Sequence, residues 1–267
     1  MLQPVRSYYL EHKTIFEENF NIVLQSFDME AIHKMRTTTK RLRALFQLIQ
    51  FLSPEQFKAK KQLKNVRQVF KHAGKIREVQ IEQELLILHK NLSDDSFEAY
   101  IEYLKQREHR EISAFLKSIP AVSKRGKILD DEKILSTIDS IPENTKNEAQ
   151  RFIDWKAGQI HKLNNLPVSD HRIHRNRTYI KQLYYLFDIL TYLTGQDKIL
   201  NKNSEQLRDI EQLIGSWHDL INSTQYLQSF FNAIKGEKTA EYLAYKKIIT
   251  AEKNSKQDEI INILKSL

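Results

Sequence analysis

Two triplets of basic residues with identical spacing are the part of this chain best suited to chemistry. A single offset of 141 residues (33 to 174) relates the triplets, which are His33, Arg36 and Lys40 in the first copy and His174, Arg177 and Lys181 in the second. Spacings of three and four residues place such side chains on one face of a helix. Arginine forks and lysine point charges both bind phosphate oxygens. The triplets therefore predict contact with a polyanionic, phosphate-rich ligand.

The same offset relates many other positions, so the chain is a duplicated unit. The register runs without gaps from about residue 32 to residue 88 of the first copy. Apolar, basic, glycine and acidic positions all recur, with Leu42 as Leu183, Leu45 as Leu186, Phe46 as Phe187, Arg67 as Arg208, Gly74 as Gly215 and Glu78 as Asp219. Both copies therefore keep a row of cations as well as an apolar core face.

The cations of the first copy adjoin the apolar face of their helix. At 100° per residue, His33, Arg36, Lys40 and Arg43 fall on one arc directly beside the core-facing arc. The row spans roughly 15 Å along the helix axis, and its like charges repel at these spacings. Either internal acids such as Glu78 and its repeat neutralise the row, or a polyanionic ligand does. Local acids are few, which favours the ligand.

The next helix adds a second basic row. Its candidate phosphate contacts are Lys64, Arg67, Lys71 and Arg77, together with Arg208 in the second copy. Between residues 34 and 77 there are thirteen lysines and arginines and one acid, Glu55. Such a concentration creates a positive field that favours an anionic partner. A solvated face is the plainer explanation of the single lysines, whereas the retained pair of Arg67 and Arg208 argues for a ligand.

The composition indicates an all-α protein. Of 267 residues, six are Gly and five are Pro, and 40% are hydrophobic, which favours helices. No run approaches the ~18 apolar residues of a membrane span, and residues 1–10 lack the pattern of a signal peptide. The chain has no cysteine, which excludes disulfides and cysteine nucleophiles, and its net charge is +8. We therefore expect a cytoplasmic protein with no membrane partner.

The apolar periodicity predicts four helices in each half of the chain. Those of the first half are expected over 5–25, 28–52, 56–91 and 96–117, with a kink or break at Gly74. Those of the second half are expected over 144–165, 170–194, 198–233 and 238–265. The pattern predicts one domain of two four-helix bundles related by a pseudo-twofold axis. The first half is then 1–119, a linker with room for one short helix is 120–142, and the second half is 143–267.

The sequence lacks familiar catalytic and metal-binding motifs. It contains no Walker A loop, no G-x-S-x-G, no H-E-x-x-H and no acidic pair for magnesium, so we expect a protein that is not an enzyme and has no cofactor. His33 and His174 have no second histidine or carboxylate three or four residues on, which argues against a metal. His109 is expected at the surface. Trp155 and Trp217 are expected in the core rather than as base-stacking platforms.

Over nearly its whole length the sequence resembles the conserved histidine α-helical domain family, CHAD. The resemblance lies in the segment from His33 to Arg43, its repeat from His174 to Lys181, and two glycine motifs that begin at Gly74 and Gly215. It implies two four-helix bundles with a basic surface or channel that binds long-chain inorganic polyphosphate. It also assigns phosphate contacts to His33, Arg36, Lys40, Arg43, His174, Arg177 and Lys181. Some relatives carry a fused triphosphatase domain; here we expect the module to stand alone.

The second copy departs from the family pattern. Gln182 stands where the first copy has Arg41, and Tyr184 where it has Arg43. We therefore expect a lopsided phosphate surface, stronger in the first half. The predicted function is non-catalytic binding of inorganic polyphosphate, with association to polyphosphate granules and proteins recruited through the ligand as consequences. Three alternatives stay open, namely a nucleic-acid-binding protein, a phosphohydrolase acting on polyphosphate, and a scaffold that docks an acidic protein.

Overall fold

Helices form almost all of the structure. The computed structural model describes residues 2–89, 97–123, 128–234 and 240–267. That part of the chain contains no strand, and its helices are α1 Gln3–Ser26, α2 Met29–Leu52, α3 Ala59–Gln62, α4 Lys64–Leu88, α5 Glu98–Ser123, α6 Asp131–Ser140, α7 Lys146–Asn164, α8 Asp170–Tyr185, α9 Phe187–Thr194, α10 Ser204–Ile234 and α11 Ala240–Lys265. The all-α prediction is confirmed. The helix boundaries expected at residues 91 and 96 lie outside the described residues.

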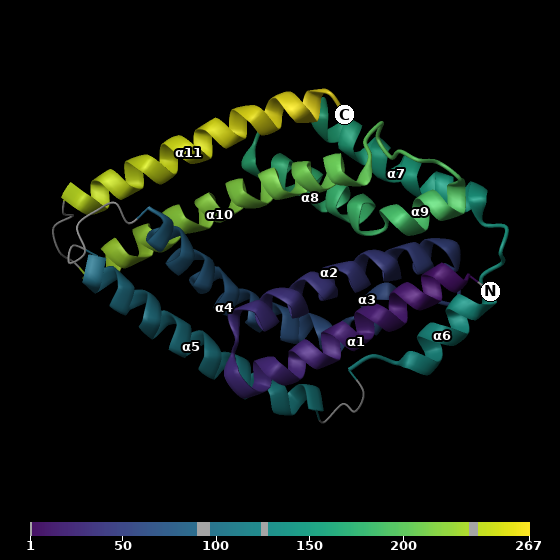
Figure 1. Cartoon of the computed structure of the whole chain (residues 1–267), viewed down its shortest axis with the longest axis horizontal. Coiled ribbons are helices and arrows are strands. Elements are labelled where there is room, and N and C mark those ends of the chain that lie inside the picture. The colour runs from purple at the N-terminus through teal and green to yellow at the C-terminus, as the bar shows by residue number, and fades with distance from the viewer. Residues whose placement is uncertain (1, 90–96, 124–127, 235–239) are drawn as a thin grey trace.

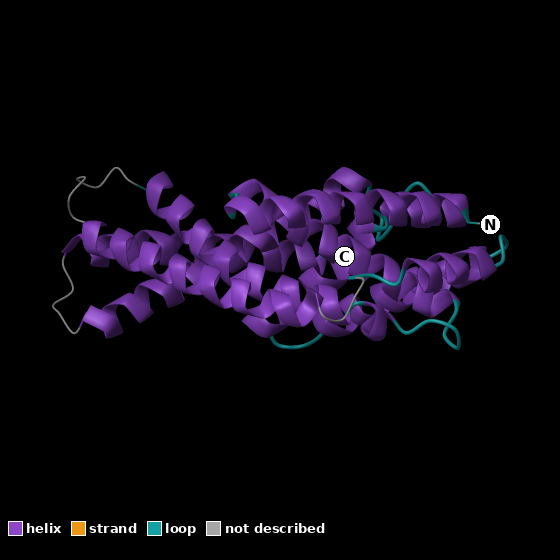
Figure 2. Ribbon diagram, turned by 90° about the horizontal axis from the view of Figure 1, so that it is seen from below, coloured by secondary structure: helices purple, strands orange, loops and turns teal. Residues whose placement is uncertain are grey.

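The two halves of the chain lie side by side. In Figure 1, helices α1 to α6 occupy mostly the lower part of the view and helices α7 to α11 the upper part. Along the boundary, α2 contacts α7 and α8, and α4 contacts α10. Figure 2, turned by 90°, shows that the helices form a flat and elongated body. This arrangement brings α2 and α8, the two helices that carry the basic triplets, next to each other.

Side-chain caps set the start of both triplet-bearing helices. The carboxylate of Asp28 accepts a hydrogen bond from the backbone N–H of Ala31 over 2.7 Å, and the hydroxyl of Ser169 accepts one from that of Arg172 over 3.3 Å. Such caps satisfy backbone donors that have no partner inside the helix. Asp28 and Ser169 are themselves separated by the repeat offset. The basic triplets therefore begin at the same distance from the start of each helix.

Two predicted helices are divided in the structure. The helix expected over 56–91 consists of α3 and α4, which meet at Leu63, and the helix expected over 170–194 consists of α8 and α9, which meet at Leu186. The predicted linker, 120–142, contains α6, which contacts α1. Apart from these divisions, each predicted helix has a counterpart in the structure.

Two buried apolar clusters hold the helices together. The larger cluster takes in α1, α2, α6 to α9 and parts of α4, α10 and α11. The smaller one joins the ends of α4 and α10 to α5 and α11, through residues such as Val79, Tyr100, Phe230 and Tyr245. Each cluster draws on both halves of the chain, so apolar packing does not divide at the predicted linker. Two separate four-helix bundles, with their boundaries at residues 119 and 143, stay a prediction.

The two tryptophans differ in burial. Trp217 is fully buried in the larger cluster, as predicted. Trp155 is 46% exposed, and the prediction that it belongs to the core is wrong. The buried face of α7 runs through Phe152 and Lys156, and Trp155 lies beside that face. His109 is exposed, as expected. Among the described helices, none is long and apolar enough to cross a membrane.

Candidate anion-binding site

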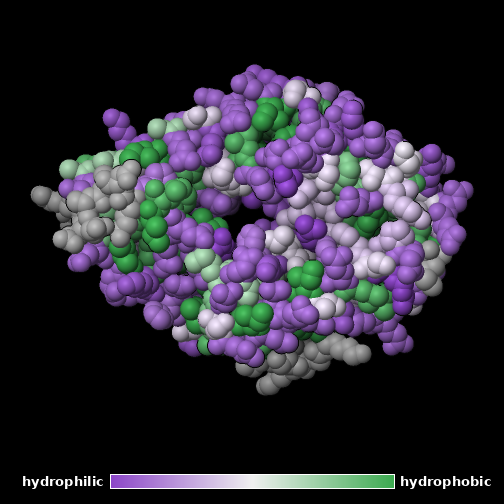
Figure 3. All heavy atoms as spheres, viewed as in Figure 1, coloured by the Kyte–Doolittle hydropathy of each residue, from purple (hydrophilic) through white to green (hydrophobic). Residues whose placement is uncertain are grey.

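A central cavity of about 840 Å³ opens where α2, α4, α8 and α10 meet. Most of the residues predicted to bind phosphate line this cavity, namely His33, Arg36, Lys40, Arg77, Arg177, Lys181 and Arg208. The space-filling view shows a hollow near the middle of the molecule, bordered largely by hydrophilic residues (Figure 3). The structure therefore brings basic side chains from both copies of the repeat to one space.

Arg36 reaches from α2 to α4, where a glycine makes room for it. Its Nη1 donates a hydrogen bond to the carbonyl oxygen of Phe70 over 2.9 Å, and its guanidinium carbon lies 4.4 Å from the centroid of the Phe70 ring. A Cβ atom at Gly74 would come within 2.5 Å of that Nη1. The helix α4 runs through Gly74, so the break predicted there as one possibility is absent. Because Gly74 has no side chain, the guanidinium group of Arg36 can pack against the backbone of α4.

The second copy builds an equivalent contact between α8 and α10. A Cβ atom at Gly215 would lie 3.0 Å from Nη2 of Arg177. The repeat offset relates Gly215 to Gly74 and Arg177 to Arg36. Two arginine–glycine contacts therefore hold corresponding guanidinium groups in the wall of the central cavity, one in each half of the chain.

The arginine and lysine of the first triplet are half-buried and form no ion pair with a described acid. Burial lowers the pKa of Arg36 to about 10; Glu78 opposes this shift and Arg77 adds to it. Burial also lowers the pKa of Lys40 well below its usual value, and the nearby Lys181 lowers it further. Within the described residues, neither Arg36 nor Lys40 has a carboxylate within ion-pair distance. An anionic ligand would raise the pKa of Lys40 and keep it charged.

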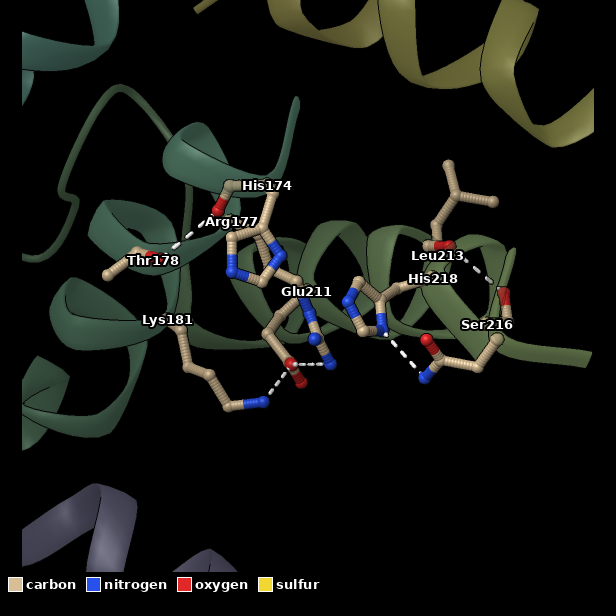
Figure 4. A network of polar contacts seen from close by, with 9 residues as sticks. His174, Arg177, Thr178, Lys181, Glu211, Leu213, Ser216 and His218 are labelled. Atoms are coloured by element: carbon tan, nitrogen blue, oxygen red, sulfur yellow. Dashed lines mark hydrogen bonds and ion pairs between the residues drawn. The ribbon is translucent and has the colours of Figure 1, made fainter. Parts of the chain in front are cut away.

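A buried glutamate pairs with two cations of the second copy. Glu211 Oε1 lies 3.2 Å from Nη2 of Arg177 and also pairs with Nζ of Lys181 (Figure 4). Burial alone would raise the pKa of Glu211, but the attraction of Lys181 and Arg177 outweighs it and lowers the pKa. Arg208 pairs with Glu205 over 3.5 Å. Each of these three predicted phosphate contacts therefore already has an acidic partner.

Glu78 and Asp219, the acids that the sequence offered as partners of the cation row, form no ion pair with Arg36 or Lys40. Glu78 pairs with Lys75 over 3.0 Å. Burial raises the pKa of its repeat, Asp219. Arg77 pairs with Glu84 over 3.2 Å. Arg177, Lys181, Arg208 and Arg77 thus each have an acid within ion-pair distance, whereas the arginine and lysine of the first triplet do not. This asymmetry agrees with a phosphate surface that is stronger in the first half.

Both the sequence and the structure of this chain are similar to those of known proteins. A family model described as the CHAD domain matches residues 13–228. The chain belongs to the CHAD domain family. The structure is similar to the crystal structure of the CHAD domain from the plant Ricinus communis, with a TM-score of 0.63 and 16% sequence identity, over 94% of this chain and 87% of that chain. No curated protein matches the sequence.

A second depression, the α4 groove, extends the basic surface of this CHAD domain. Its volume is about 800 Å³, and its basic lining consists of Arg36, Arg43, Lys60, Lys64, Arg67, Lys71 and Lys75. Glu78 is the one acid among its described lining residues. Arg43 lies with its guanidinium carbon 5.0 Å from the centroid of the Phe70 ring, next to Arg36. Arg36 lines both depressions, so the predicted contacts of α2 and α4 form one continuous basic surface.

The histidines of the site are uncharged near neutral pH. Burial and the nearby Arg77 lower the pKa of His33, and burial and Arg177 lower that of His174. His174 lies outside the cavity lining, but its ring centroid is 5.1 Å from that of His218, which lines it (Figure 4). Neutral imidazoles can donate hydrogen bonds to phosphate but add no charge. The described residues hold no group of three His, Asp or Glu side chains suited to a metal; the expectation of no metal stays a prediction.

Sequence reasoning missed one buried cation, Lys156. Its residue is 1% exposed, and its Nζ donates hydrogen bonds to the amide oxygens of Gln47, over 3.1 Å, and Gln182. Gln182 occupies the repeat position of Arg41, so α7 supplies a charge that α8 lacks. The sequence does contain an indication of this burial, because Lys156 follows Phe152 by four residues and so lies on the apolar face of its helix.

Replacing Gly74 with alanine tests whether the glycine positions Arg36. Alanine favours a helix over glycine by roughly 0.5–1 kcal/mol, so the Gly74→Ala protein should fold. Its new methyl group should displace the guanidinium of Arg36 from the carbonyl of Phe70. We expect affinity for long-chain polyphosphate to fall about tenfold, as for one lost charged hydrogen bond, in a plate-binding assay, with no loss of thermal stability.

Gly158→Ala is the matched control. Gly158 lies in the middle of α7, and a Cβ atom there would meet no atom within 4 Å. This variant should gain the same helix stabilisation without any change in binding. Wild-type affinity in the Gly74→Ala protein would show that the position of Arg36 is unimportant for the ligand.

Proposed function

We propose that this CHAD domain is a non-catalytic binding module for inorganic polyphosphate. One observation carries the proposal. Arg36, Lys40 and Arg43 lie along one side of α2, where they line the central cavity and the α4 groove, and none of them forms an ion pair with a described acid. Buried and half-buried cations of like sign repel one another unless an anion neutralises them. A chain of phosphates supplies negative charge at regular intervals.

The two depressions offer a path for a linear anion. The central cavity and the α4 groove share Arg36, and the row from His33 to Arg43 covers roughly 15 Å of helix. The ligand would follow α2 along this row. The second copy would contribute less, because Glu211 already pairs with Arg177 and Lys181 and offsets part of their charge. Phosphate contacts would thus be concentrated in the first half of the chain.

The same proposal includes the arrangement of the helices around the ligand. The duplicated H-x-x-R-x-x-x-K helices, α2 and α8, would form the walls of the basic channel, and two four-helix bundles would be related by a pseudo-twofold axis. The contact between α2 and α8 and the paired arginine–glycine contacts support this symmetry. A protein with this function would reside in the cytoplasm, associate with polyphosphate granules, and meet other proteins through the bound polymer.

Affinity for long-chain polyphosphate, measured by calorimetry at two salt concentrations, tests the proposal. Neutralising several phosphates releases counterions, so the affinity should fall steeply as salt rises, with a slope of roughly 0.7–0.9 per phosphate contact as for nucleic acids. Duplex DNA and triphosphate serve as competitors at equal phosphate concentration. We expect tight, salt-dependent binding of polyphosphate that duplex DNA does not displace.

The other outcomes point to the alternatives. Equal preference for DNA would indicate a nucleic-acid-binding protein. Release of phosphate from polyphosphate, with or without added metal, would indicate a phosphohydrolase. Absence of any polyphosphate binding would mean that the cations of α2 serve another anion, such as an acidic protein.

A further inference from the structure

A third cavity, the Lys156 pocket, lies between α2, α3, α4, α7 and α8. Its volume is about 630 Å³, which is within the range of small-molecule sites. Five basic residues line it, namely Arg43, Lys60, Arg67, Lys156 and Arg175, and its described lining contains no acid. The central cavity differs, because glutamates and an aspartate lie among its cations. The Lys156 pocket is therefore a place where positive charge has accumulated without an internal counter-charge.

Lys156 is the deepest of these cations. Its Nζ contacts two amide oxygens, of Gln47 and Gln182, which carry no net charge. The ammonium also lies 4.2 Å from the centroid of the Trp155 ring and 5.3 Å from that of Tyr179. Burial lowers the pKa of Lys156 to about 8. A buried cation without a counter-ion is costly, and an anion in the pocket would remove that cost.

The same pocket has an aromatic wall. Phe51, Trp155 and Tyr179 line it. Trp155 stacks on Phe51 with ring centroids 6.1 Å apart and an angle of 19° between the ring planes, yet it is 46% exposed. An inorganic anion gains nothing from such a wall. A planar base does, because stacking on an aromatic ring is favourable for every nucleobase.

We propose that the Lys156 pocket binds a nucleoside polyphosphate such as ATP. The base lies against the wall formed by Phe51, Trp155 and Tyr179, and the phosphates lie among Arg43, Arg67 and the other cations of the pocket. Arg43, Lys60 and Arg67 also line the α4 groove. A bound nucleotide and a polyphosphate chain would therefore compete for these residues, although each has further contacts of its own.

The nucleotide site and the polyphosphate site can be separated by mutation. Trp155 and Lys156 line neither the central cavity nor the α4 groove. Arg36 and Lys40 do not line the Lys156 pocket. Failure of the nucleotide proposal would thus leave the polyphosphate proposal untouched, and the reverse also holds.

Tryptophan fluorescence provides a direct readout, because Trp155 and Trp217 are the two tryptophans of the chain. Trp217→Phe leaves Trp155 as the single reporter. We expect ATP to quench its fluorescence and to bind about tenfold more tightly than tripolyphosphate in calorimetry, since stacking favours the base. Tripolyphosphate and adenosine separate the contributions of the phosphates and of the base. ATP binding no tighter than tripolyphosphate would overturn the proposal.

Two variants locate the binding. Trp155→Leu changes an exposed side chain and should fold; it should lower ATP affinity to that of tripolyphosphate while leaving tripolyphosphate and long-chain polyphosphate affinity as in the wild type. Lys156→Met should weaken ATP and tripolyphosphate binding together, by about tenfold for a lost charged contact. Lys105→Met, at an exposed position on α5, is the control and should change neither. Retention of the preference for ATP in Trp155→Leu would place the nucleotide elsewhere and overturn the proposal.

Discussion

Replacing Arg36 and Lys40 together with alanine should lower the affinity for long-chain polyphosphate by a factor of about one hundred or more. A hydrogen bond to a charged group contributes about 1.5–3 kcal/mol, and neither cation forms an ion pair with an acid among the described residues. The slope of affinity against salt should also fall by about one for each phosphate contact removed. Calorimetry at two salt concentrations measures both effects, and circular dichroism should show unchanged helicity.

Two exposed lysines provide a charge-matched control for the double variant. Lys105 on α5 and Lys247 on α11 are exposed and line none of the three cavities. Their replacement with alanine removes the same net charge, so a general loss of positive field would weaken binding in both proteins alike. If the control weakens binding as much as Arg36→Ala/Lys40→Ala, the ligand does not lie along α2. If the Arg36 and Lys40 variant unfolds, the two residues hold the helices together instead.

The sequence repeat predicted that the site would contain two equivalent rows of cations, because spacing along a helix determines the position of each row. Spacing along a helix decides which side chains share a face, so the alignment of Arg36 with Lys40, and of Arg177 with Lys181, followed directly. The caps at Asp28 and Ser169 then bring the two rows to equivalent positions. The role of Gly74 could not be predicted, because a glycine within a helix indicates a kink or break unless the side chains of the neighbouring helix are known.

What the sequence left open depends on contacts between distant segments. Glu211 pairs with Arg177 and Lys181 from another helix, and no spacing rule connects these residues. Lys156 compensates for the loss of an arginine at position 182 in the same way. Trp155 fits an apolar stripe, but only the packing of α7 shows that it lies beside the buried face. The sequence likewise did not predict that the core consists of two clusters, each with residues from both halves of the chain.

Replacing Glu82 with glutamine should make the pH dependence of stability shallower. Glu82 is 1% exposed in the smaller cluster, and its Oε1 accepts a hydrogen bond from the hydroxyl of Tyr100 over 2.8 Å. The hydroxyl of Tyr245 lies 3.4 Å away, and His89 also lies near enough to act on its charge. Burial raises the pKa of Glu82 to about 7, while hydrogen bonds from Ser223, Tyr100 and Tyr245 oppose the rise. The folded protein therefore holds a proton there that the unfolded chain releases at lower pH.

The sign of the effect follows from that difference. A carboxyl group with a raised pKa in the folded state favours folding most below its ordinary pKa, and this contribution is lost as pH rises through the folded value. Between about pH 4.5 and pH 7 the free energy of unfolding should thus fall by roughly 3 kcal/mol on account of Glu82. Glutamine cannot ionise. Urea unfolding at pH 5 and pH 8 should show Glu82→Gln gaining stability relative to the wild type at the higher pH, by about that amount.

The comparison between variants isolates Glu82 from other titrating groups. His12 and His218 have pKa values lowered to about 4 by burial and by neighbouring arginines, so they destabilise the fold as pH falls, in both proteins equally. Glu102→Gln, at an exposed position on α5, is the matched control and should follow the wild-type profile. Parallel profiles for Glu82→Gln and the wild type would show that Glu82 ionises freely in the folded protein. A separation that grows as pH rises from 5 to 8 would identify this buried carboxyl, which links α4 to α5 and α11, as a group whose ionisation weakens the smaller cluster.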